Sequence, residues 1–176
     1  MNILHDIEPE RITPETFMTV IEISKGSKNK YELDKTTGLL VLDRVLYTST
    51  HYPANYGFIP RTHAQDNDPL DVVVLCSESI MPMTLVECHA IGVLQMIDQG
   101  KVDEKIIAVG NHDPHFDFYE DVKELPQHLS MELKHFYEVY KMLEDKKTEV
   151  HEIKGRDVAI ASIERCIRRY KETFES

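Results

Sequence analysis

The stretch DNDPLDVVVL, residues 66–75, constrains the possible folds and functions of this chain more than any other. Asp66, Asp68 and Asp71 fall within six positions and lead directly into an aliphatic run typical of a buried strand. In an extended chain Asp66 and Asp68 point to one side and Asp71 to the other. Pro69 fixes one backbone dihedral between them, and a bend there would let the three carboxylates converge. The alternative is a solvated turn, because Asp, Asn and Pro are common turn residues.

A calcium-binding EF-hand loop is excluded for this stretch. Such a loop needs an oxygen ligand at its fifth position, glycine at its sixth and a bidentate glutamate at its twelfth. Those positions hold Leu70, Asp71 and Ser77. The carboxylates therefore belong either to a turn or to another kind of cation site.

Short apolar segments with β-branched or alternating patterns dominate the first half of the chain, separated by Gly, Ser, Asn and Thr. Residues 84–97 are long enough to form a buried helix, but Gly92 favours a bent strand. Helical spacing of apolar residues occurs from Leu133 to Leu143, with Pro126 upstream as the helix start, and again from Val158 to Tyr170. We expect strands at 17–23, 30–34, 38–47, 71–75, 84–97, 105–110 and 149–153.

Strands followed by two helices, without regular βαβ alternation, predict an α+β fold. We expect a small closed β-barrel of the OB-like type with two flanking α-helices in the C-terminal half. Neither a repeat nor a low-complexity linker divides the sequence, so one domain is expected over residues 1–176.

The charge balance limits the kinds of partner. Twenty Lys and Arg stand against 31 Asp and Glu, a formal net charge of −11, which repels nucleic acids and anionic lipid surfaces. No segment approaches the roughly 20 apolar residues of a membrane span, and the N-terminus lacks a basic flank followed by an apolar block. Cys76, Cys88 and Cys166 are odd in number and widely spaced, so we expect buried thiols. A cytoplasmic protein without nucleic-acid or membrane partners is predicted.

Four further carboxylates lie inside or beside predicted strands: Glu22, Glu32, Asp98 and Asp103. A carboxylate within a strand is costly unless it is paired or bound to a cation. If the strands curve around one cavity, up to seven carboxylates would line it. Oxygen-rich sites of this kind select hard divalent cations, above all Mg²⁺ or Mn²⁺.

Basic and phenolic residues occur in the neighbouring segments. Each alone has an ordinary interpretation, either a solvated cation or a core tyrosine, but together they are donors suited to phosphate oxygens beside a metal cluster. They are Lys30, Arg44, Tyr52, Tyr56, Lys105, Tyr140 and Lys141.

With these residues the sequence resembles the soluble family I inorganic pyrophosphatases. DNDPLD fits that family's D-x-D-P-x-D motif, and the similarity continues in the family's order and spacing over most of residues 15–145. It runs through KYELDKTTGLLVLDR, YPANYGFIP, GVLQMIDQGKVDEKIIAV and HFYEVYKMLE. The size resembles the short prokaryotic form. The chain departs from the family pattern in lacking Trp and in having His51 where a larger apolar residue is expected, and His112 and His115 have only a surface-loop interpretation.

The resemblance implies Mg²⁺-dependent hydrolysis of pyrophosphate to two phosphates by direct attack of water, in a cytoplasmic homohexamer. It implies several Mg²⁺ ions per subunit, with Mn²⁺ or Zn²⁺ as substitutes. The implied metal ligands are Asp66, Asp71 and Asp103 for the tightest ion, Asp98 and Asp103 for one that arrives with substrate, and Glu22 and Glu32 acting largely through water. Asp68 would be the general base. The implied substrate contacts are Lys30, Arg44, Lys105, Tyr140 and Lys141, with Tyr52 and Tyr56 completing the pocket.

Three other functions fit the sequence less well. A nucleotide or sugar-phosphate hydrolase would need an aromatic platform for the base or sugar, and none is evident near the motifs. A barrel that binds single-stranded nucleic acid is disfavoured by the net charge of −11. A cation-storing protein would not need Lys30, Arg44 and Lys105 beside its carboxylates.

Overall fold

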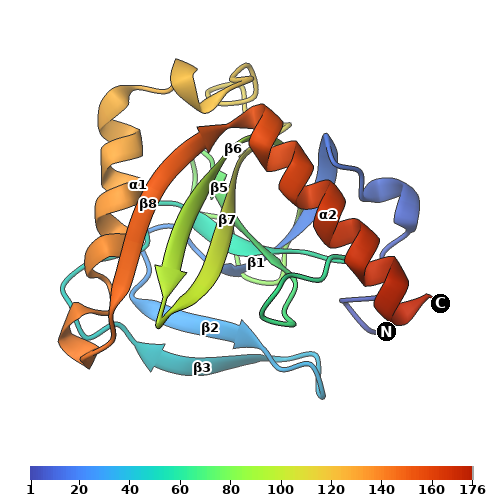
Figure 1. The fold of residues 1–176 in the computed structure, drawn as a ribbon, viewed down its shortest axis with the longest axis horizontal. Coiled ribbons are helices and arrows are strands. Elements are labelled where there is room, and N and C mark those ends of the chain that lie inside the picture. The colour runs from blue at the N-terminus through green and yellow to red at the C-terminus, as the bar shows by residue number, and fades with distance from the viewer. Residues whose placement is uncertain (176) are drawn as a thin grey trace.

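Five strands close into a ring in the computed structural model, which describes residues 1–175 (Figure 1). The order is β1-β4-β5-β7-β6, and pairing of β6 with β1 closes it. Neighbours are antiparallel except for the parallel pair β5 and β7, and β8 (Thr148–Gly155) extends the sheet beyond β6. The ring strands are β1 (Thr16–Ile23), β4 (Asn55–Ile59), β5 (Leu70–Leu75), β6 (Leu85–Asp98) and β7 (Lys101–Gly110).

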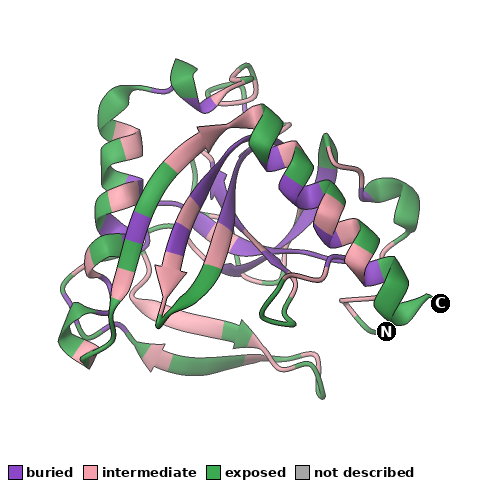
Figure 2. Ribbon diagram, in the orientation of Figure 1, coloured by how far each residue is buried: buried purple, intermediate pink, exposed green. Residues whose placement is uncertain are grey.

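A separate two-stranded sheet lies below the ring in Figure 1. It consists of β2 (Asn29–Leu33) and β3 (Leu40–Val45). Neither strand contains a buried residue, whereas the ring strands are largely buried (Figure 2). The hairpin is therefore held by a few specific contacts rather than by a core of its own.

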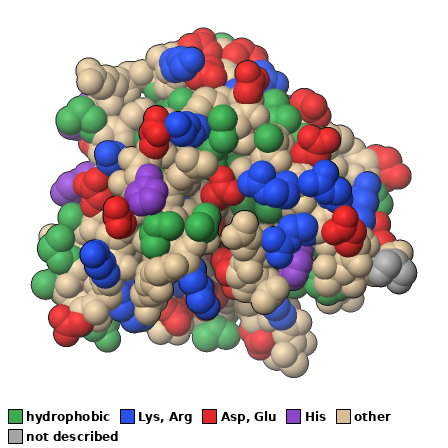
Figure 3. All heavy atoms as spheres, viewed as in Figure 1, with side chains coloured by type: hydrophobic (Ala, Val, Ile, Leu, Met, Phe, Trp, Pro, Cys, Tyr) green, Lys and Arg blue, Asp and Glu red, His purple; other side chains and the backbone are tan. Residues whose placement is uncertain are grey.

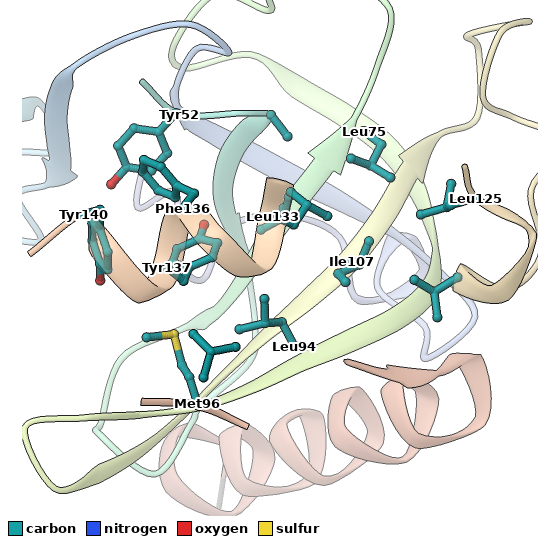
Figure 4. Packing of buried hydrophobic residues seen from close by; sticks show 14 of the residues in the cluster. Tyr52, Leu75, Leu94, Met96, Ile107, Leu125, Leu133, Phe136, Tyr137 and Tyr140 are labelled. Carbon is teal, nitrogen blue, oxygen red and sulfur yellow. The ribbon is translucent and has the colours of Figure 1, made fainter. Parts of the chain in front are cut away.

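Two helices cover different parts of the barrel. Helix α1 (Gln127–Val139) is preceded by Pro126 and buries Leu133, Phe136 and Tyr137 in the larger hydrophobic cluster (Figure 4). Helix α2 (Arg156–Phe174) packs against a second cluster on the barrel. Three short 3-10 helices complete the chain: η1 (Pro9–Arg11), η2 (Val122–Glu124) and η3 (Met142–Glu144). None of the helices within residues 1–175 is both long and apolar enough to cross a membrane.

The predicted α+β barrel with two later helices is confirmed, including the bent strand at Gly92. There the register between β6 and β7 shifts between Ala90 and Gly92. Several predictions about element ends were wrong. The strand predicted from residue 105 begins at Lys101, because its pairing with β6 continues to Asp98. The first helix ends at Val139, because the chain turns into η3 and leaves Leu143 65% exposed. The predicted strand 38–47 is shorter, because Gly38 adopts a left-handed φ of 74° in the turn before β3.

Strand β4 was not predicted, and one of the three cysteines was misjudged. The sequence YPANYGFIP carries turn-forming Pro, Asn and Gly, which hide a strand placed between β1 and β5. Cys88 and Cys166 are buried as expected, whereas Cys76, just beyond the end of β5, is half-buried.

At Gly57 the backbones of β1 and β4 approach each other closely. A Cβ atom at Gly57 would lie 1.8 Å from the carbonyl oxygen of Val20 and 2.9 Å from the Cα of Ile21. The β1–β4 register shifts just beyond this point, between Ile21 and Ile23. Only a residue without a side chain fits between the two strands.

We expect Gly57→Ala to destabilise the protein by more than about 3 kcal/mol, because backbone atoms of β1 must move to admit the methyl group. Denaturant unfolding measures this cost. Gly110→Ala is the matched control, since its Cβ would meet Val86 Cγ1 at an ordinary 3.7 Å. Similar costs for the two variants would show that close strand approach is not the constraint.

Candidate active site

A cavity of about 570 Å³ lies between the β2–β3 hairpin and the barrel, and it gathers every predicted site residue except Arg44. The chain turns at residues 65–68, where Asn67 has a left-handed φ of 67°, rather than at Pro69 as expected, and Asp66, Asp68 and Asp71 all line this cavity. The predicted residues in its lining are Glu22, Lys30, Glu32, Tyr52, Tyr56, Asp66, Asp68, Asp71, Asp98, Asp103, Lys105, Tyr140 and Lys141. Predicted site residues between positions 22 and 141 of the sequence therefore meet in one cavity.

The register of β5 and β7 places the central charges side by side. Asp71 on β5 pairs with Lys105 on β7, and Asp103 lies two residues before Lys105 on the same face of its strand. Glu104 points the other way, where it accepts hydrogen bonds from Ser162 and Arg165 of α2. The strand alternation thus separates the cavity carboxylates from a structural carboxylate.

Lys105 is the buried cation at the centre of the site, with only 3% of its surface exposed. Its Nζ lies 3.0 Å from Asp71 Oδ2 and 3.3 Å from Asp103 Oδ2, and it donates to Tyr56 Oη at 3.0 Å. Burial alone would lower the pKa of Lys105, but Asp103 and Asp71 hold it well above its ordinary value. Lys105 is therefore charged, and it partly neutralises the carboxylates around it.

The carboxylates nevertheless carry more negative charge than the buried cation balances. Burial, with repulsion from Asp71, raises the pKa of Glu22 to about 8, although its Oε1 accepts a hydrogen bond from Leu33 N–H. Burial and then the neighbouring carboxylates also raise the pKa of Asp66, and for Asp103 they do so despite Lys105. Such crowding favours binding of additional cations.

The donor set fits hard divalent cations. The cavity lining contains Asp and Glu side chains but neither Cys nor His. Carboxylate oxygens are the ligands that suit Mg²⁺ and Mn²⁺. Within residues 1–175 no three acidic, His or Cys side chains already converge on one coordination point. The reason is that Lys105 lies between Asp71 and Asp103, and Lys141 Nζ lies 2.5 Å from Asp98 Oδ2. Bound cations would have to displace these ammonium groups from the carboxylates.

Four tyrosines form one wall of the cavity: Tyr52, Tyr56, Tyr137 and Tyr140. Figure 4 shows Tyr52, Tyr137 and Tyr140 around Phe136 at the C-terminal end of α1. Burial raises the pKa of each phenol, so each remains a neutral hydrogen-bond donor. Tyr137 was not predicted as a site residue, because its helical spacing equally suits the core.

Arg44 is the predicted site residue that does not line the cavity. On β3 it pairs with Lys30 across the hairpin, but its Nη1 lies 2.5 Å from Asp43 Oδ2 and its Nε 2.6 Å from Glu144 Oε1. Glu144, on η3, has a side chain only 5% exposed. These two carboxylates draw the guanidinium of Arg44 away from the cavity.

Lys35 lines the cavity although the sequence had not singled it out. Its Nζ lies 2.5 Å from Asp68 Oδ1. The only available signal was its place in KYELDKTTG, where a lysine in a turn has the ordinary interpretation of a solvated charge. His112 and His115 do lie on an exposed loop, with side chains 86% and 75% accessible.

The lysines that line the cavity are distinct from the basic residues on the outer surface of α2. On the face shown in Figure 3, Lys and Arg side chains gather over α2, outside the cavity lining. The cavity instead receives its cations from the hairpin, from β7 and from the segment after α1, as Lys30, Lys35, Lys105 and Lys141. An anion with several negative charges would meet these lysines together with any bound metal ions.

Comparison with known proteins identifies close relatives. The family model described as inorganic pyrophosphatase matches residues 19–171. The soluble inorganic pyrophosphatase 1 of Arabidopsis thaliana is 47% identical over 168 residues, which are 96% of this chain and 79% of the plant protein.

Solved structures agree with this similarity along the whole chain. The inorganic pyrophosphatase from Thermus thermophilus has a TM-score of 0.88 and 38% identity, covering 97% of this chain and 99% of that one. The inorganic pyrophosphatase from Helicobacter pylori has a TM-score of 0.90 and 39% identity, covering 95% and 99%. The bacterial proteins therefore match this chain in length as well as in fold.

Lys105→Met is expected to destabilise the metal-free protein by about 3 kcal/mol, because it leaves two largely buried carboxylates without their cation. Added Mg²⁺ should recover part of this loss by supplying positive charge to Asp71 and Asp103. Thermal or denaturant unfolding with and without Mg²⁺ measures both effects. If Mg²⁺ stabilises Lys105→Met no more than the unchanged protein, Lys105 does not act as the counter-ion of these carboxylates.

Proposed function

The chain belongs to the inorganic pyrophosphatase family and hydrolyses inorganic pyrophosphate to two phosphates, and we propose that it does so with Mg²⁺ by direct attack of water. The observation that carries the residue assignment is the single cavity in which eight carboxylates, four lysines and five tyrosines meet. Family members are metal-dependent hydrolases, and the choice of Mg²⁺ rests on the all-oxygen donor set. We also propose that residues 1–176 form one domain.

Six carboxylates are proposed as metal ligands, in the roles implied by the resemblance: Glu22, Glu32, Asp66, Asp71, Asp98 and Asp103. The raised pKa values of Glu22, Asp66 and Asp103 support this assignment, because burial and then repulsion between carboxylates raise them and a bound cation would offset both effects. When bound, divalent ions supply positive charge to the phosphates and make water more acidic. Several ions per subunit are proposed, with Mn²⁺ or Zn²⁺ as substitutes.

The substrate is proposed to lie between hairpin and barrel. Lys30 on β2, Lys105 on β7 and Lys141 after α1 approach the cavity from three directions and suit the oxygens of two phosphates. Tyr52, Tyr56 and Tyr140 are neutral donors that add hydrogen bonds without repelling metal ions. Arg44 would join these contacts only after leaving Glu144, so its assignment requires the η3 ion pair to open.

Asp68 is proposed as the general base. It is half-exposed in the cavity, with its side chain 57% accessible, and so it can meet water. As water attacks one phosphorus, Asp68 accepts a proton from that water, the bridging P–O bond breaks, and its electron pair leaves with the second phosphate. Lysine and tyrosine donors stabilise the charge that develops on the leaving group. The reaction needs no covalent bond between phosphate and the chain.

The test of this function is phosphate release from pyrophosphate with and without Mg²⁺, measured beside ATP and a sugar phosphate. Hydrolysis of pyrophosphate that depends on Mg²⁺ is expected. Faster hydrolysis of ATP or of the sugar phosphate would favour the rival class of nucleotide or sugar-phosphate hydrolases.

We propose a cytoplasmic homohexamer. Unpaired Cys76, Cys88 and Cys166 suit a reducing compartment, and half-exposed Val41 and Val45 on β3 suit a surface covered by another subunit. Sedimentation at micromolar concentration is expected to give the mass of a hexamer. A monomeric mass would contradict this assembly.

The substitutions Asp68→Asn and Asp71→Asn distinguish the proposed general base from a proposed metal ligand. Asp68→Asn should lower turnover by about 10²- to 10⁴-fold, the usual worth of a general base, and added Mg²⁺ should not restore it. Asp71→Asn should weaken metal binding, so that part of its activity returns at high Mg²⁺. Turnover at saturating metal, together with calorimetric titration of Mn²⁺, distinguishes the two.

Asp117→Asn controls for the same change of charge outside the cavity lining. Its turnover and Mn²⁺ affinity should stay close to those of the unchanged protein. If extra metal returned Asp68→Asn to near-normal turnover, Asp68 would be a ligand and the base would have to be another group.

A further inference from the structure

The proposed site is divided between two bodies that share little packing. Lys30 and Glu32 belong to the β2–β3 hairpin, whereas Asp71, Asp103 and Lys105 belong to the barrel. Neither hairpin strand has a fully buried residue, and of the hairpin strands Tyr31 of β2 alone packs, partly buried, against the larger hydrophobic cluster. Figure 1 shows the hairpin lying across the lower side of the ring. Individual polar contacts therefore act together with this limited packing to set the distance between the two bodies.

Besides the packing of Tyr31, two polar contacts hold the hairpin to the rest of the chain. Arg44 Nε on β3 lies 2.6 Å from Glu144 Oε1 on η3. At the end of β2, Leu33 N–H donates to Glu22 Oε1 on β1 at 2.9 Å. The turn between β2 and β3 follows Leu33, so it lies beyond the Leu33–Glu22 hydrogen bond.

Lys35 bridges the cavity from that turn. Its Nζ lies 2.5 Å from Asp68 Oδ1 and 3.5 Å from the carbonyl oxygen of Asn67. Asn67 and Asp68 belong to the loop that leads into β5, on the barrel side of the cavity. The ion pair thus joins the hairpin tip to the loop that carries the proposed base.

Both ends of this bridge are held in place by their own loops. In the hairpin turn, Asp34 accepts hydrogen bonds from Thr36 N–H at 3.0 Å and from the Thr37 hydroxyl at 2.6 Å, and Gly38 N–H bonds to Asp34 O at 2.8 Å. This fixed turn presents Lys35 in one direction.

The opposite loop is equally constrained. Asp68 N–H donates to Asp66 Oδ1 at 3.1 Å, and Asp68 O accepts from Ala64 N–H at 2.8 Å. Asn67 between them has a left-handed φ of 67°, which a rigid turn maintains. An ion pair between two preorganised loops costs less side-chain ordering than one between free chains.

We propose that Lys35 is a positioning residue whose ion pair with Asp68 latches the β2–β3 hairpin across the cavity. Through this latch Lys35 sets where Lys30 stands relative to the barrel carboxylates. Its effect on hydrolysis rests on the proposed function, because Lys30 must be the substrate contact assigned above. Its effect on the hairpin does not depend on any activity.

Hydrogen exchange of the metal-free protein tests the latch directly. Lys35→Met should speed exchange of β2 and β3 backbone amides about 1.5- to 5-fold, the range expected for a half-exposed ion pair. Asp68→Asn should speed the same amides to a similar extent. Because both variants remove the same Lys35–Asp68 ion pair, the double variant should exchange no faster than either single variant.

Three control variants isolate the ion pair. Lys35→Arg keeps a cation at the tip and should restore most of the protection. Asp71→Asn removes the same charge from the same cavity but leaves the latch, and Lys171→Met removes a lysine charge on α2. Neither of these two should speed exchange in the hairpin.

Steady-state kinetics test the effect of the latch on pyrophosphate hydrolysis. Lys35→Met should raise KM for pyrophosphate about 1.5- to 5-fold and change kcat less, because the loosened hairpin misplaces Lys30 while the barrel residues stay in position. Lys35→Arg should return KM toward the original value. A fall in kcat alone would overturn the positioning role.

The outcomes separate the latch from the proposed function. Unchanged hairpin exchange in Lys35→Met, or multiplied effects in the double variant, would overturn the latch whatever the enzyme does with pyrophosphate. Faster hairpin exchange in a protein that fails to hydrolyse pyrophosphate would instead support the latch and overturn the function.

Discussion

Crowding of negative charge at one end of the barrel is the constraint on which the rest of the site depends. Asp71 and Asp103 lie within about 3 Å of the same buried lysine, and Glu22 is pressed against the same cavity with a raised pKa. In a low-dielectric setting, removal of any one charge changes the protonation of the others. Lys105 offsets part of this negative charge, and the divalent cations proposed to bind here would offset the remainder.

The closed barrel and the open hairpin have different physical tasks. Backbone pairing around the ring fixes Asp71 beside Lys105, so Asp71 and Asp103, two of the carboxylates proposed as metal ligands, stand on hydrogen-bonded barrel strands. The hairpin carries Lys30 and Glu32 on strands without a buried residue. Its position depends on the packing of Tyr31 and on ion pairs and single hydrogen bonds, which together are weaker than a buried core and more easily adjusted around a substrate.

The fold class followed from local patterns, because alternating strands and helical spacing are readable over a few residues. Gly92 correctly marked a bent strand. Local patterns failed where long-range contacts decide the structure. Asn55–Ile59 reads as a turn until β1 and β5 pair with it on both sides, and the first helix stops at Val139 although apolar spacing continues to Leu143. Neither outcome is encoded in the segment alone.

The D-x-D-P-x-D motif, with its neighbouring lysines and tyrosines, was enough to indicate phosphate chemistry with metal ions, although the strand that carries Tyr56 could not be recognised from the sequence. Only the tertiary structure decided their partners. It drew Arg44 toward Glu144, brought Lys35 to Asp68 across 33 positions of sequence, and added Tyr137 to the cavity wall. Motifs record spacing along the chain, whereas electrostatic pairing depends on distance in space, which the closure of the barrel and the placement of the hairpin set.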